Sequence, residues 1–250
     1  MNFGKLSLAG MLVLIAPSLQ AQTVYSGADL NAGPGALHPN SLAAAALFDS
    51  AASTFGTVNL INFESAPLGG FTSLSVAPGV VLAGSDFNGN PLFVSNTPNF
   101  PVAPALDGFN VTPGGANYVE QIGGTATFTF TNPIQAFGLY LTGVQTSFFQ
   151  DTITFNDGTV QTINVPAQLP SNASNGSLSF VGFTDPGKFI TQVTITASGN
   201  FGADAVGIDD VRYVLAPPAV PEPGSVALLV GLDLAGAGCL VRRKRARKAA

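Results

Sequence analysis

Two adjacent acids near the end of the chain, Asp209 and Asp210, are the residues of this sequence with the clearest potential for chemistry. They interrupt an alternating apolar run that is typical of a strand. In such a strand Asp210 shares a face with Ile208, unless a bulge intervenes. Asp209 then shares the other face with Val211 and Tyr213. One carboxylate therefore points the same way as apolar neighbours, where it must be paired, hydrogen-bonded or metal-bound.

Two solutions stay open for these acids. Calcium accepts about six to eight oxygen ligands in irregular geometry, and the first and last strands of a sandwich often lie together. Glu64, Asp209 and Asp210, with backbone carbonyls, are therefore a candidate calcium site. In the alternative, backbone amides at a strand end satisfy the carboxylates. Only Lys188 and Arg212 are available as cationic partners.

The residue types argue against catalysis. A glycosidase needs two facing carboxylates, and besides aspartates the mature domain has only Glu64 and Glu120. No Gly-x-Ser-x-Gly elbow surrounds any serine, and a Ser-His-Asp triad would need His38, the only histidine. We predict no catalytic residues and no enzyme activity, and we expect His38 to be a solvated residue.

Charge is divided unevenly along the chain. Between residues 22 and 220 only two basic residues stand against twelve acids, so this region carries a net charge of −10, compared with −5 for the whole chain. Such a surface repels phosphate backbones. The composition therefore excludes nucleic acid as a partner.

The N-terminus predicts export. Lys5 supplies a positive start, residues 6–16 are apolar, and residues 17–21 form a break that ends in a small residue. This pattern is typical of a secretory signal peptide over residues 1–21, cleaved after Ala21.

The C-terminal segment, residues 217–250, has three parts in order. Pro221, Glu222 and Pro223 come first, followed by an apolar run at 225–241 and a basic cluster at 242–248. Seventeen helical residues span about 25 Å, just under the thickness of the hydrocarbon core. The basic cluster would stay in the cytoplasm. The pattern predicts a transmembrane helix with the central region outside the inner membrane.

This arrangement closely resembles the PEP-CTERM sorting signal of Gram-negative bacteria that make exopolysaccharide. In that family the tripeptide matching Pro221, Glu222 and Pro223 is recognised by exosortase, a membrane transpeptidase. The resemblance implies that the chain is held transiently in the inner membrane, clipped near the motif, and passed to the cell surface or extracellular matrix. Asp233 departs from the pattern, since an acid at the centre of a spanning helix costs about 2.5–3.5 kcal/mol, and it predicts a weak anchor.

Residues 22–56 contain the single short helix that the sequence predicts before the main domain. Residues 22–39 are small, polar and punctuated by glycine and proline, so we expect a loose arm. Residues 41–55 are rich in alanine, with Asn40 or Ser41 placed to cap the helix and Gly56 to end it. Apolar residues at helical spacing predict that one face docks on the domain.

After Gly56 the pattern changes to a period of two in Thr, Val, Ile and Phe, which predicts strands. Residues 156–158, Asn-Asp-Gly, indicate a hairpin turn. With turns about every 8–12 residues, we predict one antiparallel β-sandwich of jelly-roll type over residues 57–216, with a barrel as the alternative. The predicted strands are 57–63, 71–76, 79–83, 118–122, 125–131, 134–142, 151–156, 159–165, 177–183, 189–197 and 205–214.

The central segment also resembles a domain common among PEP-CTERM proteins, through residues 61–65 (INFES), 180–185 (FVGFTD) and 208–213 (IDDVRY). The resemblance implies a fold similar to carbohydrate-binding jelly rolls. Residues 84–117 read as a long loop that carries Phe87, Phe93, Phe100 and Phe109. Their rings could stack on sugars or, in the alternative, cover the edge of the core.

These features together predict an exported cell-surface or matrix protein. We expect a non-catalytic binding module for extracellular polysaccharide, of the kind found in biofilms. A structural matrix or adhesion component without a specific ligand is the alternative, and a secreted hydrolase is the third possibility.

Overall fold

The computed structural model describes residues 21–30, 32–98, 108–146, 151–165, 169–170, 177–197 and 205–218. The chain divides between Ala216 and Pro217. The predicted signal peptide up to residue 20, the sorting motif and the apolar run at 225–241 lie outside the described residues. Within the described ranges, no helix has the length and apolar character needed to cross a membrane.

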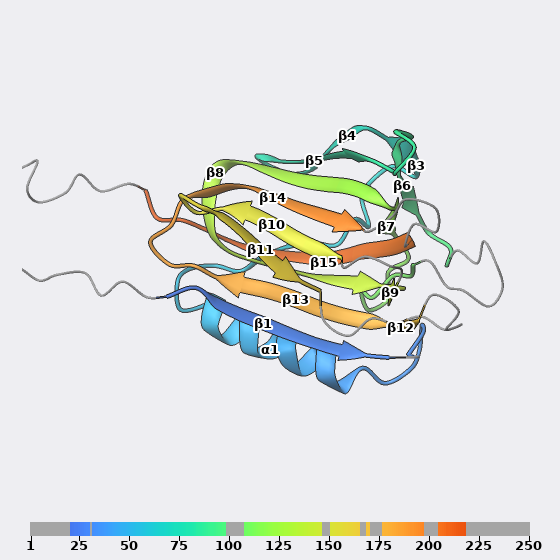
Figure 1. Ribbon diagram of the computed structural model, residues 1–250, viewed down its shortest axis with the longest axis horizontal. Coiled ribbons are helices and arrows are strands. Elements are labelled where there is room, and N and C mark those ends of the chain that lie inside the picture. The colour runs from blue at the N-terminus through green and yellow to red at the C-terminus, as the bar shows by residue number, and fades with distance from the viewer. Residues whose placement is uncertain are drawn as a thin grey trace, which may run out of the picture. The chain divides into compact units, whose positions relative to one another are not determined.

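Over the described residues the fold is mainly β with one helix, which confirms the predicted β class and the predicted N-terminal helix (Figure 1). Among the described strands, every pair is antiparallel except β9 with β12. The elements are β1 (Thr23–Asp29), α1 (Pro39–Ala52), β2 (Asn59–Ile61), β3 (Gly69–Phe71), β4 (Ser73–Ala77), β5 (Val80–Ser85), β6 (Leu92–Ser95), β7 (Tyr118–Ile122), β8 (Gly124–Thr142), β9 (Gln145–Thr146), β10 (Thr152–Asn156), β11 (Val160–Asn164), β12 (Leu169–Pro170), β13 (Leu178–Thr184), β14 (Ile190–Ala197) and β15 (Ala205–Leu215).

The long strand β8 belongs to both layers of a β-sandwich. Its first half pairs with β14 and β5, and its second half pairs with β13 and β15. The sequence predicts two separate strands here, but β8 is continuous, its register against β14 shifts between Thr129 and Ile134, and Figure 1 shows β8 folding back on itself. The β-sandwich is therefore confirmed, and the jelly-roll type stays a prediction.

The last strand, β15, is hydrogen-bonded along both edges. One edge pairs with the second half of β8, and the other pairs with β7 and then with β2. The core between the two layers is apolar and aromatic, with the rings of Phe155 and Phe183 stacked at 3.8 Å. Its largest fully buried members from β8 are Phe128, Ile134, Phe137, Leu139 and Leu141.

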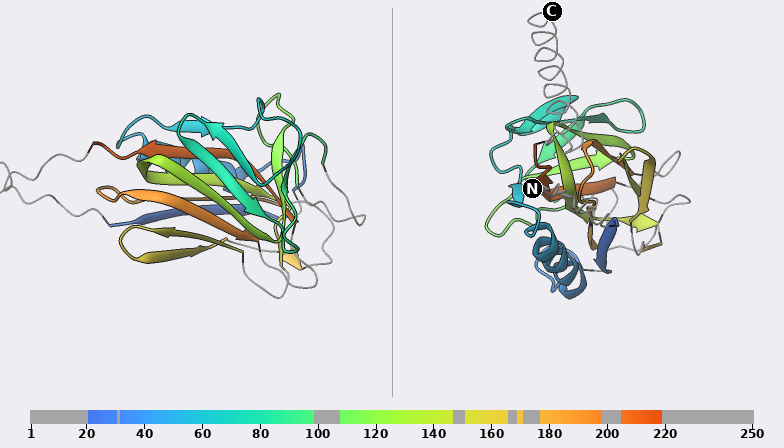
Figure 2. Two further views of the ribbon diagram at one scale, coloured as in Figure 1. Left: turned by 90° about the horizontal axis from the view of Figure 1, so that it is seen from above. Right: turned by 90° about the vertical axis from the view of Figure 1, so that its left-hand side faces the viewer.

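The helix α1 forms a third layer on the outer face of β1, β13 and β8, on the side away from β4 and β5 (Figure 2). Phe48 of α1 is fully buried and packs on Phe180 of β13, with the centroids of the two rings 5.6 Å apart. Glycines on the strands allow this close approach. A side chain at Gly27 would clash with the carbonyl oxygen of Asn40, and one at Gly182 would lie 2.9 Å from the Phe48 ring.

The start of α1 is held by a residue of β1. The sequence instead predicted a loose arm before the helix and a cap by Asn40 or Ser41. Residues 23–29 are not a loose arm, because β1 pairs along its whole length with β13. Neither Asn40 nor Ser41 caps the helix with its side chain. Instead Asp29 accepts the backbone amides of Asn40 and Ser41 at 3.0 and 2.8 Å, and the Ser41 hydroxyl at 2.6 Å. Burial by itself raises the pKa of Asp29, but these hydrogen bonds outweigh it and lower the pKa below its ordinary value.

Candidate functional site

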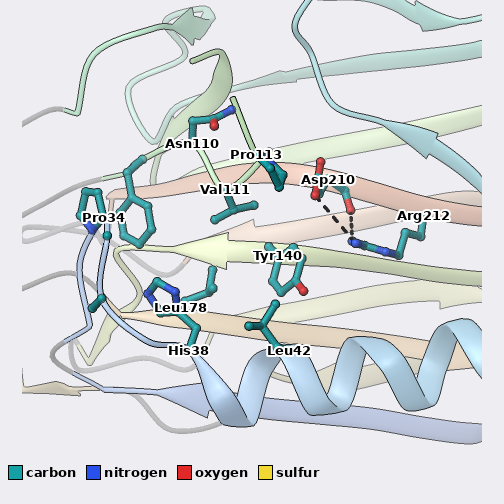
Figure 3. Close-up of a pocket in the computed structure, with 13 residues that line it drawn as sticks. Pro34, His38, Leu42, Asn110, Val111, Pro113, Tyr140, Leu178, Asp210 and Arg212 are labelled. Carbon is teal, nitrogen blue, oxygen red and sulfur yellow. Dashed lines mark hydrogen bonds and ion pairs between the residues drawn. The ribbon is translucent and has the colours of Figure 1, made fainter. Parts of the chain in front are cut away.

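A pocket of about 380 Å³ opens on the outer face of the layer that contains β8, β13 and β15 (Figure 3). Its sides are the first turn of α1 and the segment 108–117, which we call the cover segment. Apolar and aromatic groups make up much of its lining. The lining residues are Pro34, Gly35, Ala36, His38, Leu42, Phe109, Asn110, Val111, Pro113, Tyr140, Leu178, Asp210 and Arg212.

His38 lies at the edge of this pocket and is half-buried, which corrects the expectation that it is solvated. Its ring stacks on that of Phe109, with centroids 6.3 Å apart and planes inclined by 24°. Its Nε2 lies 3.0 Å from the carbonyl oxygen of Ala32, to which it donates a hydrogen bond. The residues between β1 and α1 therefore bring His38 back against the fold.

Arg212 is the cation of the pocket, and it is already paired. Its Nε lies 3.3 Å from Asp49 Oδ1 and its terminal nitrogen 3.7 Å from Asp210 Oδ2. Its guanidinium also lies over the ring of Tyr140, 5.0 Å from the centroid. Two carboxylates flank one guanidinium, so the pocket presents no excess positive charge to a ligand.

A β-bulge places Asp210 in the wall of the pocket. Opposite β8, Asp209 pairs with Tyr140 and Arg212 with Gly138, so the two residues between them face a single residue. Asp210 has a φ of 46°, in the left-handed region where aspartate is tolerated better than most residues. The strand therefore contains the bulge that the sequence left open, and Asp209 and Asp210 do not simply alternate between its two faces.

Asp209 is fully buried and bound by amides. Its Oδ2 accepts the backbone N–H groups of Val111 at 2.7 Å and Thr112 at 3.2 Å, and the Asn110 side-chain amide at 3.1 Å. Its Oδ1 accepts the amide of Asp210 at 2.8 Å. Burial raises the pKa of Asp209 to about 7, although the amides of Val111 and Asp210 act in the opposite direction.

Glu64 holds the other end of the cover segment. Its carboxylate accepts the backbone amides of Ala116 and Asn117, both within 3.1 Å, and the side-chain amide of Asn110 at 2.8 Å. The Asn110 amide therefore lies between Glu64 and Asp209. These two acids, 145 residues apart in sequence, fix one short polar segment from both ends.

The structure brings the three predicted calcium ligands around one segment, but N–H and O–H donors stand between them. Asp210 Oδ1 accepts the hydroxyl of Thr112 at 2.7 Å. In the part of the chain described, no three His, Cys, Asp or Glu side chains lie close enough to hold a metal ion together. The amide alternative is the arrangement seen for Glu64 and Asp209, and a cation would have to displace those donors. The calcium site stays a prediction.

Sequence reasoning missed several groups that form this site, notably Tyr140, Asn110 and the pairing of Asp49 with Arg212. Tyr140 lies in a run whose alternation could have placed it on the outer face. Asn110 was not singled out, because two of its partners, Glu64 and Asp209, lie far away in the sequence. Of the acids considered for a hydrolase, Glu120 lines a different pocket, and Pro221 to Pro223 lie outside the described residues.

No family model matches the chain. No curated protein matches it either. Among solved structures it is similar to the enzymatically active domain of Bacteriophage CBA120 tailspike protein 4, with a TM-score of 0.30 and 17% sequence identity. That match covers 62% of this chain and only 21% of the tailspike chain, and at this TM-score it carries no argument about function.

Proposed function

We propose that this protein is an exported, non-catalytic module that binds a neutral saccharide of extracellular polysaccharide in the pocket between α1 and the cover segment. One observation carries the proposal: the wall of an otherwise largely apolar pocket holds the Asp210–Arg212 pair with its charge balanced. A volume of about 380 Å³ falls within the range of about 300–1,000 Å³ that is usual for small-ligand sites.

The chemistry of a sugar suits these groups. Its hydroxyls can donate to the Asp210 carboxylate and accept from Arg212, and charge-assisted hydrogen bonds of this kind are the stronger ones. Its C–H faces can pack against His38 and Leu42, since burial of apolar surface is favourable. An acidic sugar is disfavoured because Asp49 and Asp210 already neutralise Arg212.

The two ends of the chain supply the cellular part of the proposal. The signal peptide at 1–21 takes the chain through the inner membrane, and the segment 225–241 anchors it there transiently. Exosortase then acts at Pro221, Glu222 and Pro223 and delivers the protein to the cell surface or matrix. Extracellular polysaccharide is the partner that we propose for it there.

The test is a titration of the full-length protein with size-fractionated oligosaccharides from the exopolysaccharide of the producing organism, in calcium and again in excess chelator. We expect saturable binding that survives chelation, with no turnover of the sugar. Asp210→Asn keeps the bulge conformation and an acceptor for Thr112 but removes the charge, and should weaken binding about tenfold or more.

Asp157→Asn, in a turn outside the pocket, is the matched control and should leave the affinity unchanged. Binding that is lost with chelator would restore the calcium hypothesis for Glu64, Asp209 and Asp210. If a folded sample binds no fraction in either buffer, the protein is instead a structural matrix component. Release of shorter sugars would show a hydrolase.

A further inference from the structure

A second pocket, of about 560 Å³, lies on strands β6 and β7. Its lining combines an aromatic ring and aliphatic surface with oxygen-bearing side chains. Phe93 is 50% exposed there and Ile122 38% exposed, so the pocket has an apolar floor in contact with solvent. The lining residues are Asp86, Asn90, Pro91, Phe93, Glu120 and Ile122.

The two pockets are linked by one row of residues across the strands. Phe93 pairs with Glu120, Glu120 with Gly207, Gly207 with Thr142, and Thr142 with Leu178. Phe93 and Glu120 line the second pocket, and Leu178 lines the first. Directly paired residues point to the same face of a sheet. Both pockets therefore open on the same outer face.

The separation of the pockets follows from this row. Four strand-to-strand steps of about 4.8 Å place Phe93 about 19 Å from Leu178. Between them the cover segment lies directly on the sheet: the Phe109 amide donates to the Thr142 hydroxyl at 3.0 Å, and a side chain at Gly207 would touch the backbone of Gly108. A ligand that reaches both pockets must be an extended chain that crosses this segment.

We propose that the pocket of Phe93 and Glu120 is a second saccharide subsite, and that the protein binds an extended polysaccharide chain across both pockets. This inference rests on the proposed function of the first pocket. In the second pocket one sugar ring packs its C–H face on the Phe93 ring, while its hydroxyls donate to Glu120. A second aromatic contact with a polymer adds affinity only when the ligand is long enough to span the two pockets.

The experiment compares disaccharide and hexasaccharide fractions of the exopolysaccharide on full-length variants. Phe93→Ala should weaken hexasaccharide binding about tenfold and leave disaccharide binding unchanged. Phe87→Ala is the matched control, since Phe87 is also an exposed phenylalanine, at 42%, and lines neither pocket. Asp210→Asn should weaken the binding of both fractions. Unchanged thermal unfolding shows that each variant is folded.

Equal hexasaccharide affinity in the wild type and in Phe93→Ala would overturn the second subsite and leave the proposed function intact. Absence of binding by either fraction to the wild type would overturn the proposed function itself. If Phe93→Ala weakens hexasaccharide binding but Asp210→Asn does not, the proposal that one chain spans both pockets is overturned.

Discussion

Replacing Asp29 tests how the pocket wall is held, because this one carboxylate fixes the start of α1. It accepts the amides of Asn40 and Ser41, the Ser41 hydroxyl and the Asn40 side chain, all within 3.0 Å. These are the amides that a helix leaves without internal partners. His38 and Leu42, which line the pocket, flank the same turn. Loss of the cap should therefore weaken both stability and saccharide binding.

The magnitude follows from the hydrogen bonds that asparagine cannot make. Asp29→Asn keeps one acceptor oxygen and turns an NH₂ group towards donors at the other position. A hydrogen bond to a charged group contributes about 1.5–3 kcal/mol net, and a helix cap about 0.5–2 kcal/mol. We expect the free energy of unfolding to fall by about 2–3 kcal/mol, which at a slope of about 2 kcal/mol per molar urea lowers the midpoint by about 1–1.5 M.

The effect should also depend on pH. Because the pKa of Asp29 is lowered in the folded state, its contribution is present above the ordinary value of 3.8 and is lost as the pH falls through the folded pKa. The difference between wild type and Asp29→Asn should therefore be full at pH 7 and shrink below pH 3.8. Urea titrations at several pH values measure it.

Asp86→Asn is the matched control. Asp86 accepts the amides of Asn88 and Asn90 at 2.8 and 2.7 Å and the Asn90 side chain at 2.8 Å, all within one exposed turn. Its replacement should cost about 0.5 kcal/mol or less. If Asp29→Asn shifts the urea midpoint no more than Asp86→Asn does, the argument that a long-range cap holds the pocket wall is refuted.

Three further predictions concern other parts of the chain. Burial and a neighbouring carboxylate raise the pKa of Asp185 to about 6, so stability should fall as the pH rises from 3.8 to 6, and Asp185→Asn should flatten that slope in urea titrations. Gly182→Ala places a methyl group against the Phe48 ring and should destabilise the fold by about 1–3 kcal/mol, measured as a lower thermal midpoint. Replacing Pro221 and Pro223 with alanine should abolish release of a shortened mature form, detected by immunoblotting; unchanged release would contradict the sorting proposal.

Much of the strand pattern could be predicted because alternation reports which side chains face a core. It correctly indicated β13 and β14 to within one residue at each end. It failed for β1, whose residues are small or polar and only partly buried. The pairing partner, β13, supplies the order that composition lacks. The sequence pattern therefore predicts a strand whose side chains are buried on one face. It does not predict a strand such as β1, which is ordered mainly by its pairing with another strand.

The candidate site was less predictable for a related reason. The sequence singled out Asp209 and Asp210 because apolar neighbours demand partners for a carboxylate, and Glu64 because first and last strands often lie together. In the structure Glu64 and Asp209 share the side-chain amide of Asn110. The identity of those partners depended on the cover segment, which reads as an ordinary loop rich in Gly, Asn and Pro. Its conformation is held by hydrogen bonds to carboxylates far away in the chain, for example the bond from the Asn117 amide to Glu64. The bulge at Asp210 likewise could not be predicted, because it depends on how β15 pairs with β8.

The pairing of β15 along both of its edges has a mechanical consequence. This strand ends at Leu215, six residues before Pro221, where the sorting proposal places the attachment of the chain. Because β8 holds one edge and β2 and β7 hold the other, a pull along the axis of β15 would have to shear the hydrogen bonds of both edges together. An edge strand under the same pull would have the hydrogen bonds of one edge only to resist it. Under the sorting proposal, the chain would therefore be attached next to a strand that is paired along both edges.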